Sequence, residues 1–241
     1  MALPVSGRKN VQYKAGGRRR VLPDVPGITL ERGWWTQGAV VCGVDEVGRG
    51  AWAGPVTMGA VVLPSDRRMY KLRDSKVLDP QRREELAARI LGFAPAVSIG
   101  HASNEECDRL GMTQALRRAA WRAVDGLAVR PDVVLLDGNW DFLAGYGTHN
   151  ERVIGGDARS ASIAAASIVA KVARDRLMTE ACPAFPAYVF SQNKGYPSPL
   201  HQAVLAAQGP CRLHRVSWAP VAAATRDLSS PGDEALRHPH P

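Results

Sequence analysis

The chain has 241 residues, of which 45% are hydrophobic and 22% charged, and its formal net charge at pH 7 is +8. This composition supplies enough apolar side chains for a core and fits one α/β domain with extensions, which excludes a wholly disordered chain. No apolar run is long enough to span a membrane and the N-terminus lacks the apolar segment of a signal peptide, so we expect a cytoplasmic protein without a membrane partner.

The positive charge is unevenly placed. The first 36 residues carry +5 of it and the rest of the chain only +3, so bulk charge is weak evidence for a polyanionic partner of the folded part. Residues 1–28 are polar and basic, which predicts a disordered arm, and residues 229–241 predict a disordered tail. The triple arginine at 18–20 could add salt-sensitive affinity for phosphates.

The first predicted strand ends in two acids. Residues 40–44 form a short β-branched run that stops at Asp45 and Glu46, and a glycine-rich turn follows before a second apolar run at 56–63. These features predict a hairpin that delivers two carboxylates to the rim of a sheet. The alternative is a strand end whose two acids are simply solvated.

The later elements follow from helix caps and apolar patterns. Asp79 before Pro80 is an N-cap followed by proline at the first helical position, and Ser103 with Glu106 forms a capping box. Strands alternating with helices predict an α/β fold in which a mixed five-stranded sheet is flanked by helices. In chain order we predict a helix at 79–91, a strand at 97–100, a helix at 103–127, strands at 132–137 and 152–157, a helix at 160–178, and a helical appendage from 183 to 228 with a helix at 198–209.

Acidic side chains end three of the predicted strands. Because α/β sheets bind ligands where the carboxyl ends of their strands meet, we expect Asp45, Glu46, Asp137 and Asp157 to converge. Four carboxylates in one place repel each other unless cations neutralise them, and hard oxygen ligands suit Mg²⁺ or Mn²⁺. Two such ions could support phosphoryl displacement. The histidines and cysteines have no ligand-like spacing, and we expect the four cysteines to be reduced.

The residues around these acids suit a nucleic acid. The Gly48-Arg49-Gly50 backbone could approach a ribose directly, and Tyr196 on a glycine-proline turn could stack on a sugar or base. Lys76, Lys171, Arg174 and Lys194 are candidate phosphate contacts. Taken singly, each of these four cations is more often only a solvated surface charge, and Tyr196 is as often a half-buried core residue as a stacking one.

Taken together, the motifs resemble those of the ribonuclease HII family in collinear order from about residue 30 to residue 221. The motifs that carry the resemblance are Gly43-Val44-Asp45-Glu46-Val47-Gly48-Arg49-Gly50, Ala53-Gly54-Pro55-Val56, Asp74-Ser75-Lys76, Leu136-Asp137-Gly138, Gly156-Asp157, the run 163–172 with Arg174-Asp175, Lys194-Gly195-Tyr196 with His201, and His214-Arg215 with Ser217. The resemblance implies an RNase H-like catalytic domain at 29–182 with a C-terminal helical extension at 183–228.

The resemblance also implies an activity. Family members use divalent metal to hydrolyse the RNA strand of RNA–DNA hybrids, leaving 3′-hydroxyl and 5′-phosphate ends. They also nick duplex DNA on the 5′ side of a single embedded ribonucleotide, which starts ribonucleotide excision repair. By motif, the four acids would be catalytic and metal-binding, Gly48, Arg49 and Gly50 would read the 2′-hydroxyl, and Tyr196 would stack at the RNA-to-DNA junction. Arg159 stands where the family usually has a lysine and would keep a phosphate contact.

Two other functions fit part of this sequence. A ribonuclease HIII-like nuclease would carry an N-terminal substrate-binding domain and typically a glutamate as its fourth acid, whereas the basic arm is short and residue 157 is Asp. A non-catalytic hybrid-binding module would bind phosphates better without four acids in its cleft. We therefore expect an active enzyme, acting as a monomer on RNA–DNA hybrids and on duplex DNA that contains ribonucleotides.

Overall fold

The computed structural model describes residues 25–70, 72, 75 and 78–228, together with the backbone of two short antiparallel strands, β1 (Val11–Gln12) and β2 (Arg20–Val21). Apart from these strands and residues 25–28, the predicted N-terminal arm lies outside the described residues, as do Lys76 and the predicted tail. Over the described ranges, none of the helices combines the length and the apolar character that a membrane crossing requires.

A mixed five-stranded sheet forms the centre of the molecule, as predicted. Its strand order is β5-β4-β3-β6-β7, with β3 antiparallel to β4, β4 antiparallel to β5, and the β3–β6 and β6–β7 pairs parallel. β3 and β6 therefore end at the same edge of the sheet, and each ends with acids. The strands are β3 (Val41–Val47), β4 (Val56–Val62), β5 (Ala96–Ala102), β6 (Val133–Asp137) and β7 (His149–Val153).

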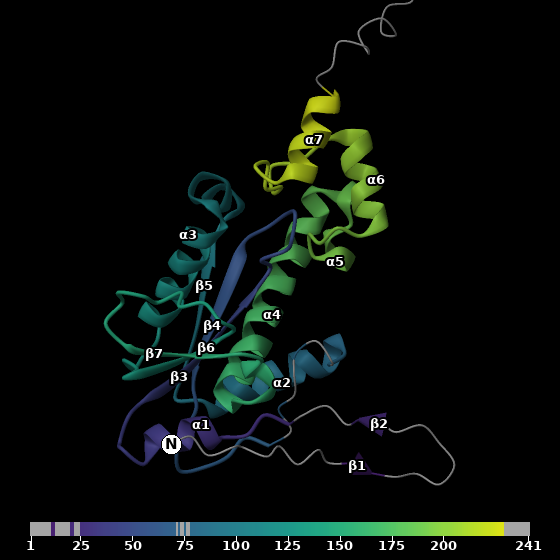
Figure 1. Ribbon diagram of the computed structural model, residues 1–241. Coiled ribbons are helices and arrows are strands. Elements are labelled where there is room, and N and C mark those ends of the chain that lie inside the picture. The colour runs from purple at the N-terminus through teal and green to yellow at the C-terminus, as the bar shows by residue number, and fades with distance from the viewer. Residues whose placement is uncertain are drawn as a thin grey trace, which may run out of the picture.

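Helices cover both faces of this sheet (Figure 1). α3 (Asn104–Asp125) packs on one face against alternate residues of β3, β4, β5 and β6. α4 (Ala161–Ala181) packs on the other face with α2 (Pro80–Phe93), and α1 (Thr29–Trp35) contacts the β3–β6 side of that face. α4 approaches the sheet so closely that a Cβ on Gly43 would lie 2.2 Å from the main chain of Ser162. Glycine at this position therefore sets the depth of α4.

A helical extension lies at the C-terminal end of α4 (Figure 1). Buried Tyr188 and Phe190 form its core together with Met178 of α4 and Ala53 of the loop that follows β3. The predicted helix between Ser198 and Gly209 is confirmed, because Ser198 caps it and Pro199 starts it. The elements of the extension are η3 (Cys182–Ala184), η4 (Pro186–Tyr188), α5 (Phe190–Asn193), α6 (Pro199–Gln208) and α7 (Ala219–Leu228).

Two predicted elements need correction. The strand predicted at 152–157 runs instead over β7 and starts earlier, because His149 already pairs with Val133 of β6. It ends at Val153, and Gly155 at φ +62° turns the chain into the short helix η2 (Gly156–Ala158), so Asp157 is not at a strand end. The long helix α3 starts at its capping box as predicted, but Gly111 at φ +74° interrupts it with a kink.

Candidate active site

The two central parallel strands bring three carboxylates to one edge of the sheet. Val44 of β3 pairs with Leu136 of β6, so the next residues, Asp45 and Asp137, lie side by side. Burial and the negative charge of Asp137 raise the pKa of the Asp45 carboxyl well above its usual range, and the charge of Glu46 adds to this effect. A hydrogen bond with Ser167 opposes the rise. The structure thus places Asp45 beside Asp137, two of the four acids that the sequence predicts to converge.

Asp157 lies on η2, beside a residue that is bound to β6. The N–H of Gly156 donates to Asp137 Oδ1 at 2.6 Å, so the residue next to Asp157 is hydrogen-bonded to the carboxylate of β6. Asp157 is itself buried, at 7% exposure. The fourth acid thus comes from a turn that the sheet does not define, which explains why its position could not be obtained from strand pairing.

Glu31 of α1 binds the segment that joins η2 to α4, a role that the sequence did not predict. Its carboxylate is fully buried, and Oε1 accepts hydrogen bonds from Ser160 Oγ at 2.6 Å, Ser162 N at 2.9 Å and Ser162 Oγ at 2.7 Å. These donors surround the N-terminus of α4, where a negative charge also interacts favourably with the helix dipole. No sequence signal separates this glutamate from an exposed one on an amphipathic helix.

Glu31→Ala is expected to lower the free energy of unfolding by about 2 to 3 kcal/mol, because three buried donors lose their acceptor. Urea denaturation of the variant measures this change. Glu180→Ala, at an exposed position near the end of α4, is the matched control and should change stability by less than about 0.5 kcal/mol. Equal stabilities of the two variants would contradict the capping role of Glu31.

Ser167 of α4 connects a further motif to the acids. Its hydroxyl lies 2.9 Å from the hydroxyl of Ser75, which belongs to the Asp74-Ser75-Lys76 motif, and it also bonds to Asp45. The described part of this motif therefore reaches the carboxylates through one serine. Both serines are buried, which suits a supporting role.

The donor set fits a hard divalent cation in its chemistry. All these acidic groups are carboxylates, and the pKa of Asp45 is raised first by burial and then by the negative charge of Asp137, which a cation would offset. One oxygen each of Asp45 and Asp137 accepts a main-chain N–H, from Glu46 at 2.7 Å and from Gly156 at 2.6 Å. As the side chains of the described residues are placed, no three or more His, Cys, Asp or Glu enclose an ion position.

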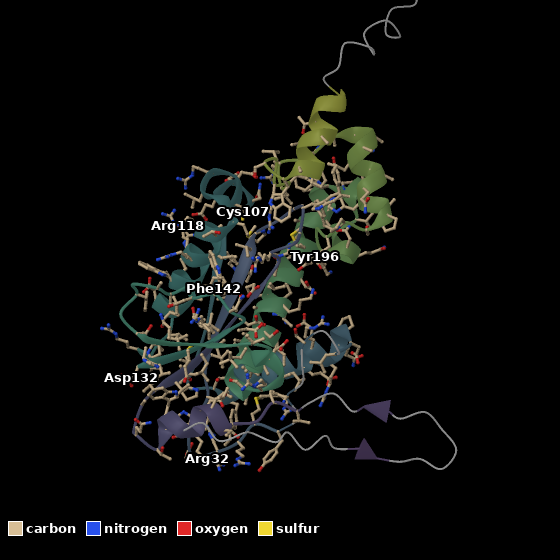
Figure 2. The ribbon with its side chains drawn as sticks, in the orientation of Figure 1. Arg32, Cys107, Arg118, Asp132, Phe142 and Tyr196 are labelled. Atoms are coloured by element: carbon tan, nitrogen blue, oxygen red, sulfur yellow. The ribbon has the colours of Figure 1, made fainter. Side chains whose placement is uncertain are left out.

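The glycine loop after β3 lies against Tyr196. Gly48 adopts a φ of +85°, and its N–H donates to Tyr196 Oη at 3.1 Å. Tyr196 is half-buried, and Figure 2 places it near the end of α4, where the C-terminal extension begins. Gly50 is exposed, and a Cβ at this position would meet no atom within 4 Å. The structure thus brings the loop and the tyrosine together next to the acids of β3.

Arg174 occupies a different position from the predicted phosphate contact. Its side chain is fully buried, and its guanidinium donates to the carbonyls of Pro55 at 2.9 Å, Lys194 at 2.9 Å and Ala53 at 3.1 Å. It also lies 5.2 Å from the ring centroid of Tyr196, a cation–π distance. Burial lowers its pKa. Arg174 therefore positions the loop and the tyrosine from their buried side, and its side chain is not accessible to a substrate.

Arg215 performs the same task from the C-terminal extension. It is fully buried and donates to the carbonyls of Gly48 at 2.7 Å, Arg49 at 3.0 Å and Gly54 at 3.1 Å. In a trans peptide the N–H points opposite to the preceding carbonyl, so the N–H groups of Arg49 and Gly50 are directed away from Arg215. Both residues are exposed. The loop thus presents two adjacent main-chain donors outward, an arrangement that binds anionic or hydroxyl oxygens.

The other side chains that were predicted to contact phosphates differ in how exposed they are. The side chain of Arg49 is 62% exposed and lies 4.0 Å from Glu46, and the side chain of exposed Arg159 donates a long hydrogen bond of 3.4 Å to the carbonyl of Ile154. Lys171 is half-buried, bonds to Asp175 at 2.5 Å, and has its pKa lowered by burial. Among the predicted cations that lie in the described ranges, Arg49 and Arg159 are accessible, whereas Lys171 is engaged with Asp175 and Lys194 with Thr179 and the carbonyl of Ser191.

Comparisons with known proteins agree with this architecture. The family model for ribonuclease HII matches residues 42–221. A ribonuclease HII of Streptomyces avermitilis is 50% identical over 196 residues, which cover 80% of this chain and 84% of that protein. A ribonuclease HII of Caulobacter vibrioides is 47% identical over 203 residues, which cover 84% of this chain and 94% of that protein. The crystal structure of ribonuclease H2 from Pyrococcus horikoshii OT3 shares the fold, with a TM-score of 0.69 and 24% identity over 79% of this chain and 99% of that one. The chain therefore belongs to the ribonuclease HII family and is a hydrolase that acts on RNA–DNA hybrids.

Proposed function

We propose that the protein is a divalent-metal-dependent endonuclease that cuts the RNA strand of hybrids and also incises duplex DNA on the 5′ side of a single ribonucleotide. Both cuts leave 3′-hydroxyl and 5′-phosphate ends. The observation that carries this proposal is the hydrogen bond from Gly48 to Tyr196, made within two residues of the paired acids of β3. Residues 29–182 form the catalytic domain in this proposal, and residues 183–228 the extension that supplies the tyrosine.

Asp45, Glu46, Asp137 and Asp157 would hold the metal, Mg²⁺ or Mn²⁺. When bound, the metal supplies positive charge that activates water and stabilises a leaving 3′ oxygen. The carboxylates themselves determine where that charge is concentrated, because the register of β3 and β6 fixes Asp45 beside Asp137. Their own negative charge repels phosphate, so this edge of the sheet binds a nucleic acid backbone only when the charge is compensated.

The glycine loop would read the ribose. A 2′-hydroxyl is both donor and acceptor, and it is the group that distinguishes RNA from DNA at a site. The outward N–H groups of Arg49 and Gly50 can donate to it or to the adjacent phosphate, and the absence of a Cβ on Gly50 allows close approach. Tyr196 would stack on the neighbouring sugar, with its hydroxyl fixed by Gly48. The exposed cations of Arg49 and Arg159 would contact phosphates.

Tyr196→Ala is expected to reduce incision at a single ribonucleotide about tenfold more than cleavage of a long hybrid, because loss of a stacked ring costs about 1 to 3 kcal/mol at the junction. Steady-state kcat/KM on the two substrates gives the ratio. Tyr196→Phe keeps the ring and removes only the hydroxyl that Gly48 binds, so it should retain more of the ratio. Equal losses on both substrates would refute the junction role.

The proposed function is tested with an end-labelled DNA duplex that contains one ribonucleotide, incubated with Mg²⁺, Mn²⁺ or EDTA. A nick on the 5′ side of the ribonucleotide in either metal, and none in EDTA, is the expected result. Cleavage of only a long hybrid would limit the function to ribonuclease H activity without junction recognition. Tight binding with no cleavage of either substrate would favour a silent hybrid-binding module.

A further inference from the structure

We propose that His201 and His214 are positioning residues, whose hydrogen-bonded imidazole pair fixes the main chain at Tyr196 so that its ring stays aligned with the glycine loop. The inference rests on the proposed role of Tyr196 in reading the RNA-to-DNA junction. It assigns a specificity function to two side chains that lie outside the acid cluster and do not face the substrate.

Three hydrogen bonds run in series from the tyrosine turn to the loop before His214. His201 Nδ1 lies 2.8 Å from the carbonyl of Tyr196, the two Nε2 atoms lie 2.9 Å apart, and the N–H of Cys211 lies 3.0 Å from His214 Nδ1. A carbonyl only accepts and an amide N–H only donates. His201 must therefore carry its proton on Nδ1, and His214 must accept at Nδ1.

These two constraints determine which ring nitrogens of the pair carry a proton. Neutral His201 with Nδ1–H offers the lone pair of Nε2, and neutral His214 with a free Nδ1 carries its proton on Nε2, so a single proton lies between the rings. The carbonyl of Cys211 lies farther from His214 Nδ1, at 3.3 Å, and already accepts the main-chain N–H of His214 at 3.0 Å. Every ring nitrogen of the pair is thus used once in one consistent pattern.

The surroundings keep both imidazoles neutral. His201 and His214 are 0% and 1% exposed, and the ring of Tyr188 lies 4.8 Å from that of His214 while Phe190 lies 5.6 Å from His201. Burial lowers the pKa of His201 and lowers that of His214 to about 4. The pair therefore keeps its single shared proton at pH 7, and adding another would break one of the three bonds.

The pair holds Tyr196 at the end opposite to the glycine loop. Gly48 binds the tip of the side chain, whereas His201 binds the carbonyl of the same residue. The turn is further tied to the loop because Trp52 N–H donates to the carbonyl of Gly195 at 2.8 Å. With its tip and its main chain both fixed, the ring cannot tilt without breaking one of these bonds.

The test is a double-mutant cycle. His201→Leu removes both bonds of its ring, and His201→Asn keeps an N–H donor near the position of Nδ1. The readout is the ratio of kcat/KM for single-ribonucleotide incision to kcat/KM for long-hybrid cleavage. His201→Leu is expected to lower this ratio about tenfold, because the hydrogen bond that holds the carbonyl of Tyr196 is lost. His201→Asn is expected to lower the ratio by less than about threefold. In the Tyr196→Ala background the His201 substitutions should leave the ratio unchanged.

Each outcome bears on the inference. An unchanged ratio in His201→Leu, or the same tenfold loss in the Tyr196→Ala background, would overturn it and leave junction reading by Tyr196 intact. An unchanged ratio in Tyr196→Ala itself would overturn both. If His201→Leu fails to fold, ¹⁵N shifts of the imidazoles in the wild-type protein at pH 7 decide: Nδ1–H on His201 and Nε2–H on His214 are expected, and any other tautomer or a charged ring would overturn the pairing.

Discussion

Asp45→Asn and Asp137→Asn are each expected to lower the cleavage rate by about 10³-fold or more, because each removes a charge that holds the proposed metal. Single-turnover cleavage of a long hybrid in Mg²⁺ and in Mn²⁺ measures this loss. Hybrid binding, followed by fluorescence anisotropy in EDTA, should be retained or tightened, since one negative charge facing the phosphates is gone. Near-normal turnover by either variant in both metals would remove the metal-site assignment.

The melting temperature of Asp45→Asn should rise, although its cleavage rate falls. The pKa of Asp45 is raised by burial and by Asp137, so its ionised form is destabilised in the folded protein at pH 7. Asparagine carries no such charge, and Asp45→Asn is therefore expected to raise the melting temperature in the absence of metal. Asp66→Asn, in an exposed loop, is the matched control and should alter neither activity nor melting temperature. A lower melting temperature for Asp45→Asn would show that the carboxylate contributes more through its hydrogen bonds than it loses by repulsion.

Gly48→Ala is expected to reduce cleavage of both substrates by about 10²-fold, through displacement of the loop that positions the substrate. Gly48 has a left-handed φ of +85°, and an added Cβ would lie 2.1 Å from Nε of Arg174, whose guanidinium is fixed by three carbonyls. Neither the backbone nor the arginine can move without losing buried hydrogen bonds, so the melting temperature should fall as well. Cleavage assays and thermal melts measure the two effects.

The control for this variant is Gly92→Ala. Gly92 lies on α2, and a Cβ there would meet no atom within 4 Å, so the same chemical change should leave activity unchanged and stability unchanged or slightly higher. If Gly48→Ala behaves like Gly92→Ala, the loop does not need its left-handed residue, and the close packing of Arg174 beneath it has no functional consequence.

The sequence was sufficient to predict those parts of the site that depend on local pattern. A β-branched run that ends in two acids gave Asp45 and Glu46, a second gave Asp137, and the order of strands and helices gave a mixed sheet in which they meet. The capping residues Asp79, Ser103 and Ser198 are each followed by the expected helix. These signals act over a few residues, which is why they can be read from the chain.

The parts that could not be predicted depend on contacts between distant residues. Glu31 binds Ser162 across 131 positions, and Arg215 binds Gly48 across 167. The sequence does not distinguish a buried arginine that donates to carbonyls from a surface arginine that contacts phosphate. Arg174 was therefore predicted on the substrate side of the loop, whereas it lies on the buried side. Asp157 was predicted at a strand end, and this placement is wrong because parallel pairing of His149 with Val133, which starts the strand earlier, leaves no local pattern in the sequence.

The dependence of the glycine loop on Arg215 has a consequence for the protein during its synthesis. The acids of β3 and β6 leave the ribosome long before residue 215, so the nascent chain can assemble the sheet while Gly48, Arg49 and Gly54 still lack the donors that bind their carbonyls. The same holds for Tyr196, whose main chain is bound through the imidazoles of His201 and His214. A ribosome-bound chain therefore cannot complete the hydrogen bonding beneath its glycine loop until translation has passed residue 215, so the acids are synthesised well before the loop beside them can be fixed.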